Sequence, residues 1–472
     1  MFVNRQDELA QLERWWASGE PLGLVWGRRR VGKTMLLGRF AEGRPLAVVH
    51  TGGRRPPGLE LQILSAEVAR AGLAGTRDLV SRPYSNWDEA FEALTSAARV
   101  EPVLVVLDEF PELVATSPEL EGVLRALCDA LPRPSPLRVL LCGSAVRTME
   151  ALAEERRPLF GRFGLRMAVH PFRPHEAGLL LHDLDPSTRA VVWGLVGGTP
   201  LYLSWWDQAA SVRANLAELV CSPAGRLLTE GQLILATEGD NSGLSGQVMA
   251  AIAAGRTKFG EIKDAVRTDP TRTLERLVEL RLVERMVPVL EDPARTRRAV
   301  YRIADNFLAF WLGIVDRHRS EIDRGLGPSI LSVVLGSLDD HLGPRFEEAF
   351  RQHLRREAAA GAFGDVVAIG PSWSGGADEI DAVALAGRER RAVLVGEAKW
   401  TRRVDARRVE AALHRKAASL PSVGDPLRLA VAAREEVTGA APGTFVVTAA
   451  DIFGGPGRSR RAPGRRRPRA RA

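Results

Sequence analysis

The chain has 472 residues, of which 45% are hydrophobic and 26% are charged. This composition excludes a collagen-like or wholly disordered protein, and the length suggests roughly three domains. No run approaches the ~20 continuous apolar residues of a membrane helix, and the N-terminus lacks a basic segment followed by an apolar core. Three scattered cysteines exclude a disulfide framework and a thiolate zinc site. We therefore expect a soluble, cytoplasmic, multidomain protein with no membrane segment.

The basic charge of the chain is concentrated at its C-terminal end. The net charge is +7, and residues 458–471 contain eight arginines and no acidic residue, so the rest of the chain is near neutral. A run of Arg, Pro and Gly cannot bury enough apolar surface to fold, which predicts a disordered tail over 456–472. Such a tail is either a merely solvated end or a source of non-specific attraction to nucleic acid.

Lysine is rare in this chain. Only five of its 65 basic residues are lysines: Lys33, Lys258, Lys263, Lys399 and Lys416. In a chain that uses arginine almost everywhere, a lysine inside a motif indicates chemistry that the planar guanidinium does not supply. Two of the five, Lys33 and Lys399, lie in the two strongest motifs.

The first motif follows a short apolar run, Leu22–Trp26, which is predicted to be a strand. The next residues, GRRRVGKT at 27–34, match the phosphate-loop pattern G-x-x-x-x-G-K-[ST], and a helix-like segment follows them. Backbone N–H groups of such a loop surround a phosphate, and the helix N-terminus adds partial positive charge. The alternative is an Arg/Gly turn that fits the pattern by chance. The expected nucleotide site comprises Gly27, Arg28, Arg29, Arg30, Val31, Gly32, Lys33, Thr34, Met35, Asp108 and Ser144.

A second element completes this site. The run Val103–Leu107 is continuously apolar, which is typical of a strand buried on both faces of a parallel sheet, and Asp108 and Glu109 follow it. We assign Lys33 to the β- and γ-phosphates of ATP, and Thr34 with Asp108 to Mg²⁺. Glu109 is assigned as the general base that polarises the attacking water.

A third apolar run, Leu137–Cys142, is followed by Gly143 and Ser144. A small polar residue at the tip of the strand beside the metal-binding strand can sense the γ-phosphate of a bound nucleotide. The alternative is that Gly143 and Ser144 form a simple turn.

These segments resemble the archaeal-type P-loop ATPases, also called DEXX-box ATPases, which are related to the AAA+ and STAND groups. The resemblance covers most of the chain before the tail. It implies a place near the adenine for Arg5 and a γ-phosphate-sensing or subunit-bridging role for Arg162; the alternative for both is an ordinary surface or packing arginine. The matching stretches are FVNRQDEL (2–9), WGRRRVGKT, VLVVLDEF, LLCGSA, LFGRFGLRMAVHPFRPHEA (159–177) and GLVGGTPLYL (194–203).

The middle of the chain is predicted to be helical. Residues 171–240 read as amphipathic helices, where ATPases of this group carry a helical lid. Over 241–305 three helices, SGQVMAAIAAG, KFGEIKDAV and TRTLERLVELRLVERM, precede a hairpin made of VPVL and AVYRIA, which predicts a winged helix. This module either contacts DNA phosphates or serves protein interaction and packing. Its basic residues are Lys258, Arg272, Arg276, Arg281, Arg295, Arg297 and Arg298.

The C-terminal part carries the second motif. An amphipathic helix is predicted over Leu342–Leu354, with Glu347 and Glu348 near its start, and a hairpin follows at EIDAVALA (379–386) and RAVLVGEAKW (391–400). Glu397 and Lys399 point the same way because side chains alternate on a strand, and Asp381 on the antiparallel neighbour can complete the cluster. Two carboxylates can hold a divalent cation, and a lysine can orient water or neutralise developing charge.

This cluster resembles the PD-(D/E)XK restriction-endonuclease superfamily and the uncharacterised domain usually fused to these ATPases. The resemblance implies catalytic roles for Asp381, Glu397 and Lys399, with Glu347 as a further Mg²⁺ ligand beside Asp381 and Glu397. The sequence departs from the pattern because Ile380, not proline, precedes Asp381. The alternative is a β-hairpin with a surface Glu and Lys.

The expected fold is α/β and multidomain: a P-loop NTPase parallel sheet (1–170), a helical lid (171–240), a winged helix (241–305), a restriction-endonuclease-like α/β domain (306–455) and the tail. The expected function is ATP binding and hydrolysis coupled to action on DNA, with nuclease activity left open. The alternative is a nucleotide-controlled regulatory or signalling switch whose nuclease-like module is inactive and mediates interactions. ATP, Mg²⁺ and DNA are the expected partners, and a homo-oligomer is left open.

Overall fold

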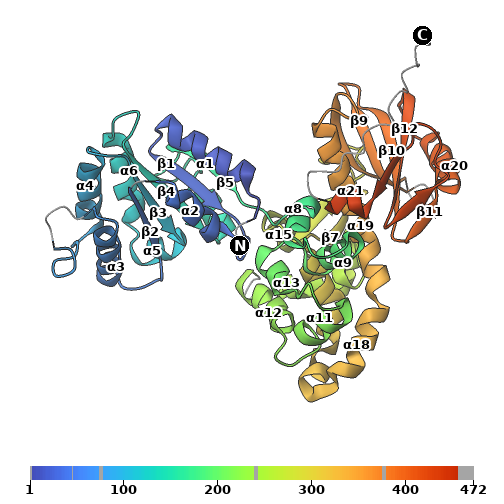
Figure 1. Cartoon of the computed structure of the whole chain (residues 1–472), viewed down its shortest axis with the longest axis horizontal. Helices are drawn as coiled ribbons and strands as arrows, with labels where there is room; N and C mark the ends of the chain where they lie inside the picture. Colours follow the sequence, from blue (N-terminus) through green and yellow to red (C-terminus); the bar gives the residue numbers. More distant parts are fainter. Residues whose placement is uncertain (1–2, 45, 74–77, 239–242, 375–378, 455–472) are drawn as a thin grey trace, which may run out of the picture. The chain divides into compact units, whose positions relative to one another are not determined.

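The computed structural model describes residues 3–44, 46–73, 78–238, 243–374 and 379–454. The chain forms two compact units (Figure 1). Unit 1 contains Met1–Pro171 and Thr199–Leu201, and unit 2 contains Phe172–Gly198 and Tyr202–Ala472. The predicted Arg-rich tail lies outside the described residues. No helix in the described ranges is long and apolar enough to cross a membrane.

Unit 1 is built on a five-stranded sheet in the order β2-β3-β4-β1-β5, and all its strand pairs are parallel. Every residue of β1, β3 and β4 is buried, as their continuous apolar runs predict. Because β4 lies between β1 and β3, the loops that follow these three strands meet at one edge of the sheet. The strands are β1 (Leu22–Trp26), β2 (Leu46–Thr51), β3 (Val103–Asp108), β4 (Leu137–Gly143) and β5 (Phe163–Ala168).

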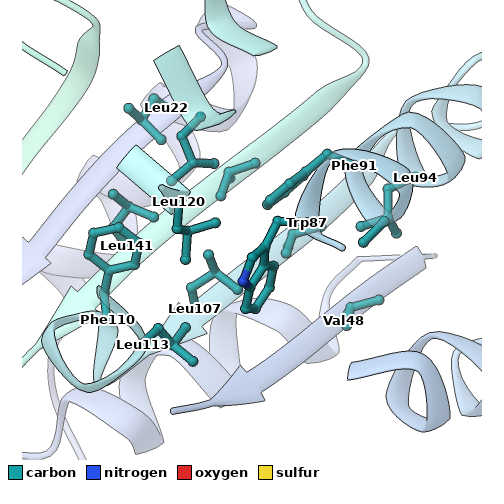
Figure 2. Close-up of a cluster of buried hydrophobic side chains, with 14 of the residues drawn as sticks. Leu22, Val48, Trp87, Phe91, Leu94, Leu107, Phe110, Leu113, Leu120 and Leu141 are labelled. Atoms are coloured by element: carbon teal, nitrogen blue, oxygen red, sulfur yellow. The ribbon is translucent and has the colours of Figure 1, made fainter. Parts of the chain in front are cut away.

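Helices cover both faces of this sheet. On one face Trp87 and Phe91 pack with Leu107 and Phe110 in a large buried cluster (Figure 2). On the other face Phe40 lies in a second cluster with residues of α1 and of the strands. The helices are α1 (Gln6–Ser18), α2 (Lys33–Glu42), α3 (Pro57–Arg70), α4 (Trp87–Ala98), α5 (Phe110–Thr116), α6 (Leu120–Ala130) and α7 (Val146–Ala151).

Unit 2 begins with helices. The segment predicted to be helical forms α8 (Pro174–Leu180), α9 (Pro186–Val196), α10 (Pro200–Trp205), α11 (Val212–Leu219) and α12 (Arg226–Glu238). Three more helices follow, and then two short antiparallel strands. These elements are α13 (Leu244–Ala253), α14 (Phe259–Val266), α15 (Thr271–Glu279), β6 (Val283–Met286) and β7 (Val300–Ile303).

The predicted end of the third helix was wrong. The sequence predicted helix through VERM and a strand at VPVL, but α15 ends at Glu279 and Val283–Met286 is strand β6. Arg281, two residues past the helix, has a φ of 56° in the left-handed region, which turns the chain out of the helix. Arg285 and Tyr301 then face each other across the two strands.

A helical connection links this hairpin to the C-terminal sheet. Its aromatic segment packs in the core, with Phe307, Phe310 and Trp311 buried. The last helix, α19, packs against β8, β9 and β10 of the sheet described next. The elements are α16 (Asn306–Phe310), a π-helix at Trp311–Val315, a 3-10 turn at Asp316–His318, α17 (Arg319–Glu321), a π-helix at Ile322–Leu326, α18 (Gly327–Gly336) and α19 (Leu338–Ala359).

The C-terminal sheet has five strands in the order β14-β12-β10-β9-β8 (Figure 1). The pairs β8–β9 and β9–β10 are antiparallel, whereas β10–β12 and β12–β14 are parallel. Helix α20 packs on β10 and β12. The elements are β8 (Val366–Ser372), β9 (Ile380–Ala386), β10 (Arg391–Lys399), β11 (Arg403–Asp405), α20 (Ala406–Ala417), β12 (Val423–Ala433), β13 (Glu436–Thr438), β14 (Phe445–Thr448) and α21 (Ala449–Phe453).

The core beneath β3 yields a stability prediction. Leu107→Ala removes a fully buried side chain next to Asp108 and is expected to lower the free energy of unfolding of unit 1 by about 2–5 kcal/mol. Denaturant unfolding followed by tryptophan fluorescence measures the loss. Val100→Ala is the control, since Val100 is 90% exposed and its truncation should change stability by less than about 0.5 kcal/mol. Equal stability of the two variants would contradict the packing described here.

Candidate functional site

The phosphate loop leaves β1 at Gly27 and enters α2 at Lys33. A Cβ atom at Gly27 would lie 2.2 Å from the Val169 carbonyl oxygen, so only glycine fits there. Gly32 has a φ of 89°, a conformation that side-chain-bearing residues rarely adopt. The two glycines of the motif are therefore required by close approach and by backbone geometry, which rejects the chance-turn alternative on structural grounds.

Lys33 is buried, with 5% of its surface exposed. Its Nζ donates hydrogen bonds to the carbonyl oxygens of Gly27 at 2.8 Å and Arg28 at 3.0 Å. The ammonium group is thus held over the loop by neutral acceptors only, which leaves its charge available to an anion bound in the loop. Such a group can bind the phosphates of a nucleoside triphosphate.

The metal-binding pair predicted from the sequence is brought together. Thr34 Oγ1 donates to Asp108 Oδ2 at 2.7 Å, and this bond joins the start of α2 to the end of β3. A hydroxyl and a carboxylate are the oxygen ligands that Mg²⁺ prefers. The residues therefore fit a nucleotide-bound Mg²⁺, for which they would supply two protein contacts.

Glu109 is held next to Ser144. Glu109 has a left-handed φ of 49°, and its Oε2 accepts hydrogen bonds from the Ser144 backbone N–H at 3.2 Å and hydroxyl at 2.9 Å. Strained backbone of this kind is concentrated at functional sites. The strand order explains the contact, because β4 delivers Ser144 between the phosphate loop and the acids of β3. The structure thus places the predicted base and the predicted sensor in direct contact.

The remaining loop residues have different environments. Arg29 Nε lies 3.5 Å from Ser144 Oγ, so this arginine reaches the same edge as Glu109. Val31 is buried in the core beside the loop, whereas Met35 is 54% exposed. Arg30 has a φ of 69°. Arg28 contributes its backbone oxygen to Lys33.

The two arginines implicated by resemblance differ. Arg5 is buried and donates to the backbone oxygens of Val31 at 2.8 Å and His170 at 2.7 Å, so it fixes the N-terminal segment to the phosphate loop. Its place near an adenine stays a prediction.

Arg162 does not reach the phosphate loop of its own chain. It precedes β5, whose first residue, Phe163, pairs with Leu22 at the opposite end of β1 from the loop. The separation is about 16 Å at a strand rise of ~3.3 Å per residue. Its guanidinium forms two hydrogen bonds with Asp129, at 2.9 and 3.0 Å. The γ-phosphate-sensing role within one chain was therefore wrong.

The second predicted cluster lies in unit 2. Ala382 of β9 pairs with Gly396 of β10, so Asp381 and Glu397 follow at the next position of the two antiparallel strands. Asp381 Oδ2 accepts the Ala398 N–H at 2.8 Å, and Lys399 Nζ donates to Glu397 Oε1 at 2.6 Å. The structure therefore brings all three residues of the motif together at one end of the hairpin.

Glu347 of α19 belongs to the same electrostatic group. Burial, followed by the charge of Asp381, raises the pKa of Glu347 to about 7. Burial and then the charge of Glu397 raise the pKa of Asp381 to about 6. The three carboxylates repel one another, and a divalent cation would relieve that repulsion, so their charge and donor type fit Mg²⁺. Their spacing differs from that of a formed centre: across the described ranges, no three His, Cys, Asp or Glu side chains group closely enough to hold a metal ion.

Comparison with known proteins gives a family model and a curated relative. The DUF234 family model, "Archaea bacterial proteins of unknown function", matches residues 311–410. An uncharacterized ATP-binding protein of Methanocaldococcus jannaschii is 51% identical over 47 residues, which are 10% of this chain and 80% of that protein. The chain belongs to the P-loop ATPases that carry a DUF234 domain.

Two longer matches agree with this family. An uncharacterized protein of M. jannaschii is 24% identical to the DUF234 ATPase over 411 residues, 85% of this chain and 88% of that protein. The structure of a Walker-type ATPase of Pyrococcus abyssi is similar in fold, with a TM-score of 0.51 and 21% identity, over 66% of this chain and 96% of that one. The similarity supports an α/β fold with a parallel P-loop sheet.

The DUF234 ATPase has one site residue that the sequence motif did not include. Lys416 Nζ of α20 donates to Glu397 Oε2 at 2.9 Å, so Glu397 is held between Lys416 and Lys399. Val395 packs in a cluster with α20, and Glu397, two residues further along β10, lies on that same side. The only signal in the sequence was the rarity of lysine, which applies to Lys416 as it does to Lys33.

Glu348 takes no part in this carboxylate group. Its two oxygens accept hydrogen bonds from Arg302 at 3.0 Å, Arg351 at 2.9 Å and Arg355 at 3.1 Å. Although burial acts to raise it, these arginines hold the pKa of Glu348 well below its usual range. The sequence placed both glutamates near the start of a helix, but α19 begins at Leu338, and both lie in its middle.

The phosphate loop generates a binding prediction. Lys33→Ala removes the ammonium group from the loop and is expected to weaken ATP binding at least 100-fold, because no other lysine can take its place there. Isothermal titration calorimetry of the full chain with ATP and Mg²⁺ measures the change. Lys258→Ala is the matched control, since the Lys258 side chain is 72% exposed and lies in unit 2. Unchanged ATP affinity in Lys33→Ala would show that this loop does not bind the nucleotide.

Proposed function

We propose that the DUF234 ATPase binds and hydrolyses ATP at unit 1 and acts on DNA through a Mg²⁺-dependent nuclease site in unit 2. The ATPase half rests on one observation above all: Lys33, Thr34, Asp108 and Glu109 meet at one edge of a parallel sheet. The relative named as an ATP-binding protein supports the same assignment.

The residues of unit 1 account for each part of the hydrolysis. Glu109 accepts a proton from a water molecule, whose oxygen attacks the γ-phosphorus as the bond to the β-phosphate oxygen breaks. Lys33 stabilises the negative charge that accumulates on the β- and γ-phosphate oxygens. Thr34 and Asp108 would hold the Mg²⁺ that neutralises the phosphates. Ser144 positions Glu109 through two hydrogen bonds.

The nuclease half rests on element order together with the cluster. The element order is α19, β8, β9, β10, β11, α20 and β12, with β8, β9 and β10 antiparallel and β12 parallel to β10. This order supports a core of the PD-(D/E)XK type, which the sequence resembles. Asp381, Glu397 and Glu347 would hold Mg²⁺, and Lys399 would orient the water that attacks a phosphodiester phosphorus. The bond from that phosphorus to the leaving sugar oxygen then breaks.

The elements α13–α15, β6 and β7 are proposed to form a winged helix that contacts DNA phosphates. Arg272 and Arg297 are exposed and suit this role. Arg295 and Arg298 face Asp292 and Glu291 at 3.5 and 2.8 Å, which reduces the positive charge of the wing. DNA contact through this module would therefore depend mainly on helix α15, which carries Arg272, and on Arg297 in the loop between β6 and β7.

A second candidate function has its own support. Glu397 is neutralised by two lysines in the structure, which suits an inactive nuclease-like module that mediates interactions. The chain would then be a nucleotide-controlled regulatory switch with slow ATP hydrolysis.

The role of Glu109 is tested by Glu109→Gln. The amide retains hydrogen bonding with Ser144 but accepts no proton at neutral pH, so ATP binding should persist while the hydrolysis rate falls about 100-fold or more. Phosphate release and calorimetric ATP binding measure the two properties separately. Glu112→Gln, a change of the same charge on the following helix, is the control. A normal rate of ATP hydrolysis in Glu109→Gln would show that Glu109 is not the general base.

The nuclease assignment is tested with linear and supercoiled DNA, with Mg²⁺ or Mn²⁺, in the presence and absence of ATP. Lys399→Ala is expected to abolish cleavage, because it removes the group that orients water. Arg213→Ala, at an exposed position on α11 outside the proposed winged helix, should cleave like the wild type. Mn²⁺ binding that is lost in Asp381→Asn supports the same site. Intact ATP hydrolysis with no cleavage under any condition would reject the nuclease and favour the switch.

A further inference from the structure

A pocket of about 480 Å³ in unit 2 is lined by residues of α13, β7, α16, α18 and α19 and of the two short helical turns that follow α16. Its size falls within the range of about 300–1,000 Å³ that is usual for small-molecule sites. The pocket is distinct from the carboxylate cluster, because Glu347, Asp381, Glu397 and Lys399 are absent from its lining. More than half of its lining residues lie within the segment matched by the DUF234 model.

The wall of the pocket carries more positive than negative charge. Arg302, Arg317 and Arg345 line it together with one acidic residue, Asp340, which is exposed. Arg302 is already paired, with Glu284 at 2.6 Å and Glu348 at 3.0 Å. Glu348 also accepts hydrogen bonds from Arg351 and Arg355, so its oxygen atoms have little capacity left to accept from a further cation.

Arg345 is half-buried in this wall, whereas Arg317 is exposed and donates to the Gly313 backbone oxygen. Arg345 Nη1 donates to the Ile303 backbone oxygen at 3.1 Å, and the structure gives Arg345 no ion pair with a carboxylate in the described ranges. Its Nε is buried without a hydrogen-bond partner. An unpaired buried charge of this kind is costly unless a ligand completes it.

The rest of the pocket is apolar, aromatic or neutral. Ile252, Ile303 and Ile314 line it, and Tyr301 adds an aromatic ring. His341 is neutral, because burial and then the charge of Arg345 lower its pKa to about 3. Its Nε2 lies 2.9 Å from the Gly194 backbone oxygen, and because a carbonyl only accepts, Nε2 carries the proton. A molecule bound in the pocket would therefore contact positive charge at one end and apolar side chains over the rest of its surface.

We propose that this pocket binds a small organic phosphate, with its phosphate group on Arg345 and its apolar or aromatic body against Tyr301 and the isoleucines. The planar guanidinium of Arg345, which lines the pocket, matches phosphate oxygens in a two-bond geometry. This site is separate from the phosphate loop in unit 1 and stands whether or not the proposed nuclease is active.

The test is calorimetric titration of the full-length Lys33→Ala chain, which removes binding at the phosphate loop. The probes are phenyl phosphate, AMP, inorganic phosphate and phenol. Phenyl phosphate or AMP should bind at least tenfold more tightly than inorganic phosphate, and phenol should not bind measurably. Equal binding of inorganic phosphate would show a free-phosphate site and overturn the organic ligand.

Two variants in the same background locate the binding. Arg345→Met should weaken it at least tenfold, whereas Arg213→Met, the same charge change on the exposed face of α11, should leave it unchanged. If circular dichroism shows that Arg345→Met is unfolded, Val333→Glu replaces it. Val333 lines the pocket and is 47% exposed, so this variant adds a negative charge without disturbing the core and should weaken binding about tenfold. Absence of binding by every phosphate probe, or binding that the folded pocket variants do not change, would overturn the proposal.

Discussion

The parallel register of β1, β4 and β3 is the constraint on which the nucleotide site depends. Parallel strands end at the same edge, so the phosphate loop, Ser144 and the Asp108–Glu109 pair are brought together from three distant parts of the sequence. The Thr34–Asp108 hydrogen bond of 2.7 Å then fixes α2 against β3. The core covers both faces of these strands, since every residue of β3 is buried.

The nucleotide site could be predicted from sequence because its chemistry is local. Eight consecutive residues form the loop, and a continuous apolar strand predicts where the acids lie. The end of α15 could not be predicted, since the apolar spacing continues past Glu279. The residue with left-handed backbone that ends the helix is Arg281, whereas a glycine at that position would have indicated a turn. The position of Arg162 could not be predicted for a different reason: a family resemblance suggests a role for a residue but does not show which end of a strand it occupies.

The carboxylate cluster was predictable only in part. Asp381, Glu397 and Lys399 follow from strand periodicity, but Lys416 enters from a helix that has no motif spacing to the others. The Arg345 pocket gave no signal at all, because its lining is drawn from seven separate elements and each arginine is ordinary in its local sequence. A cavity is a property of packing, and the charge balance of its wall depends on which carboxylates are already paired.

The two sides of helix α19 in the DUF234 domain face groups of opposite charge. Adjacent residues on it, Glu347 and Glu348, have pKa values displaced in opposite directions, because one faces carboxylates and the other faces arginines. Arg351 connects the two sides: it donates to Glu348 at 2.9 Å and to the Asp381 backbone oxygen at 2.8 Å. Arg351, which is only 2% exposed, thus links the arginines on one side of α19 to the carboxylates on the other side.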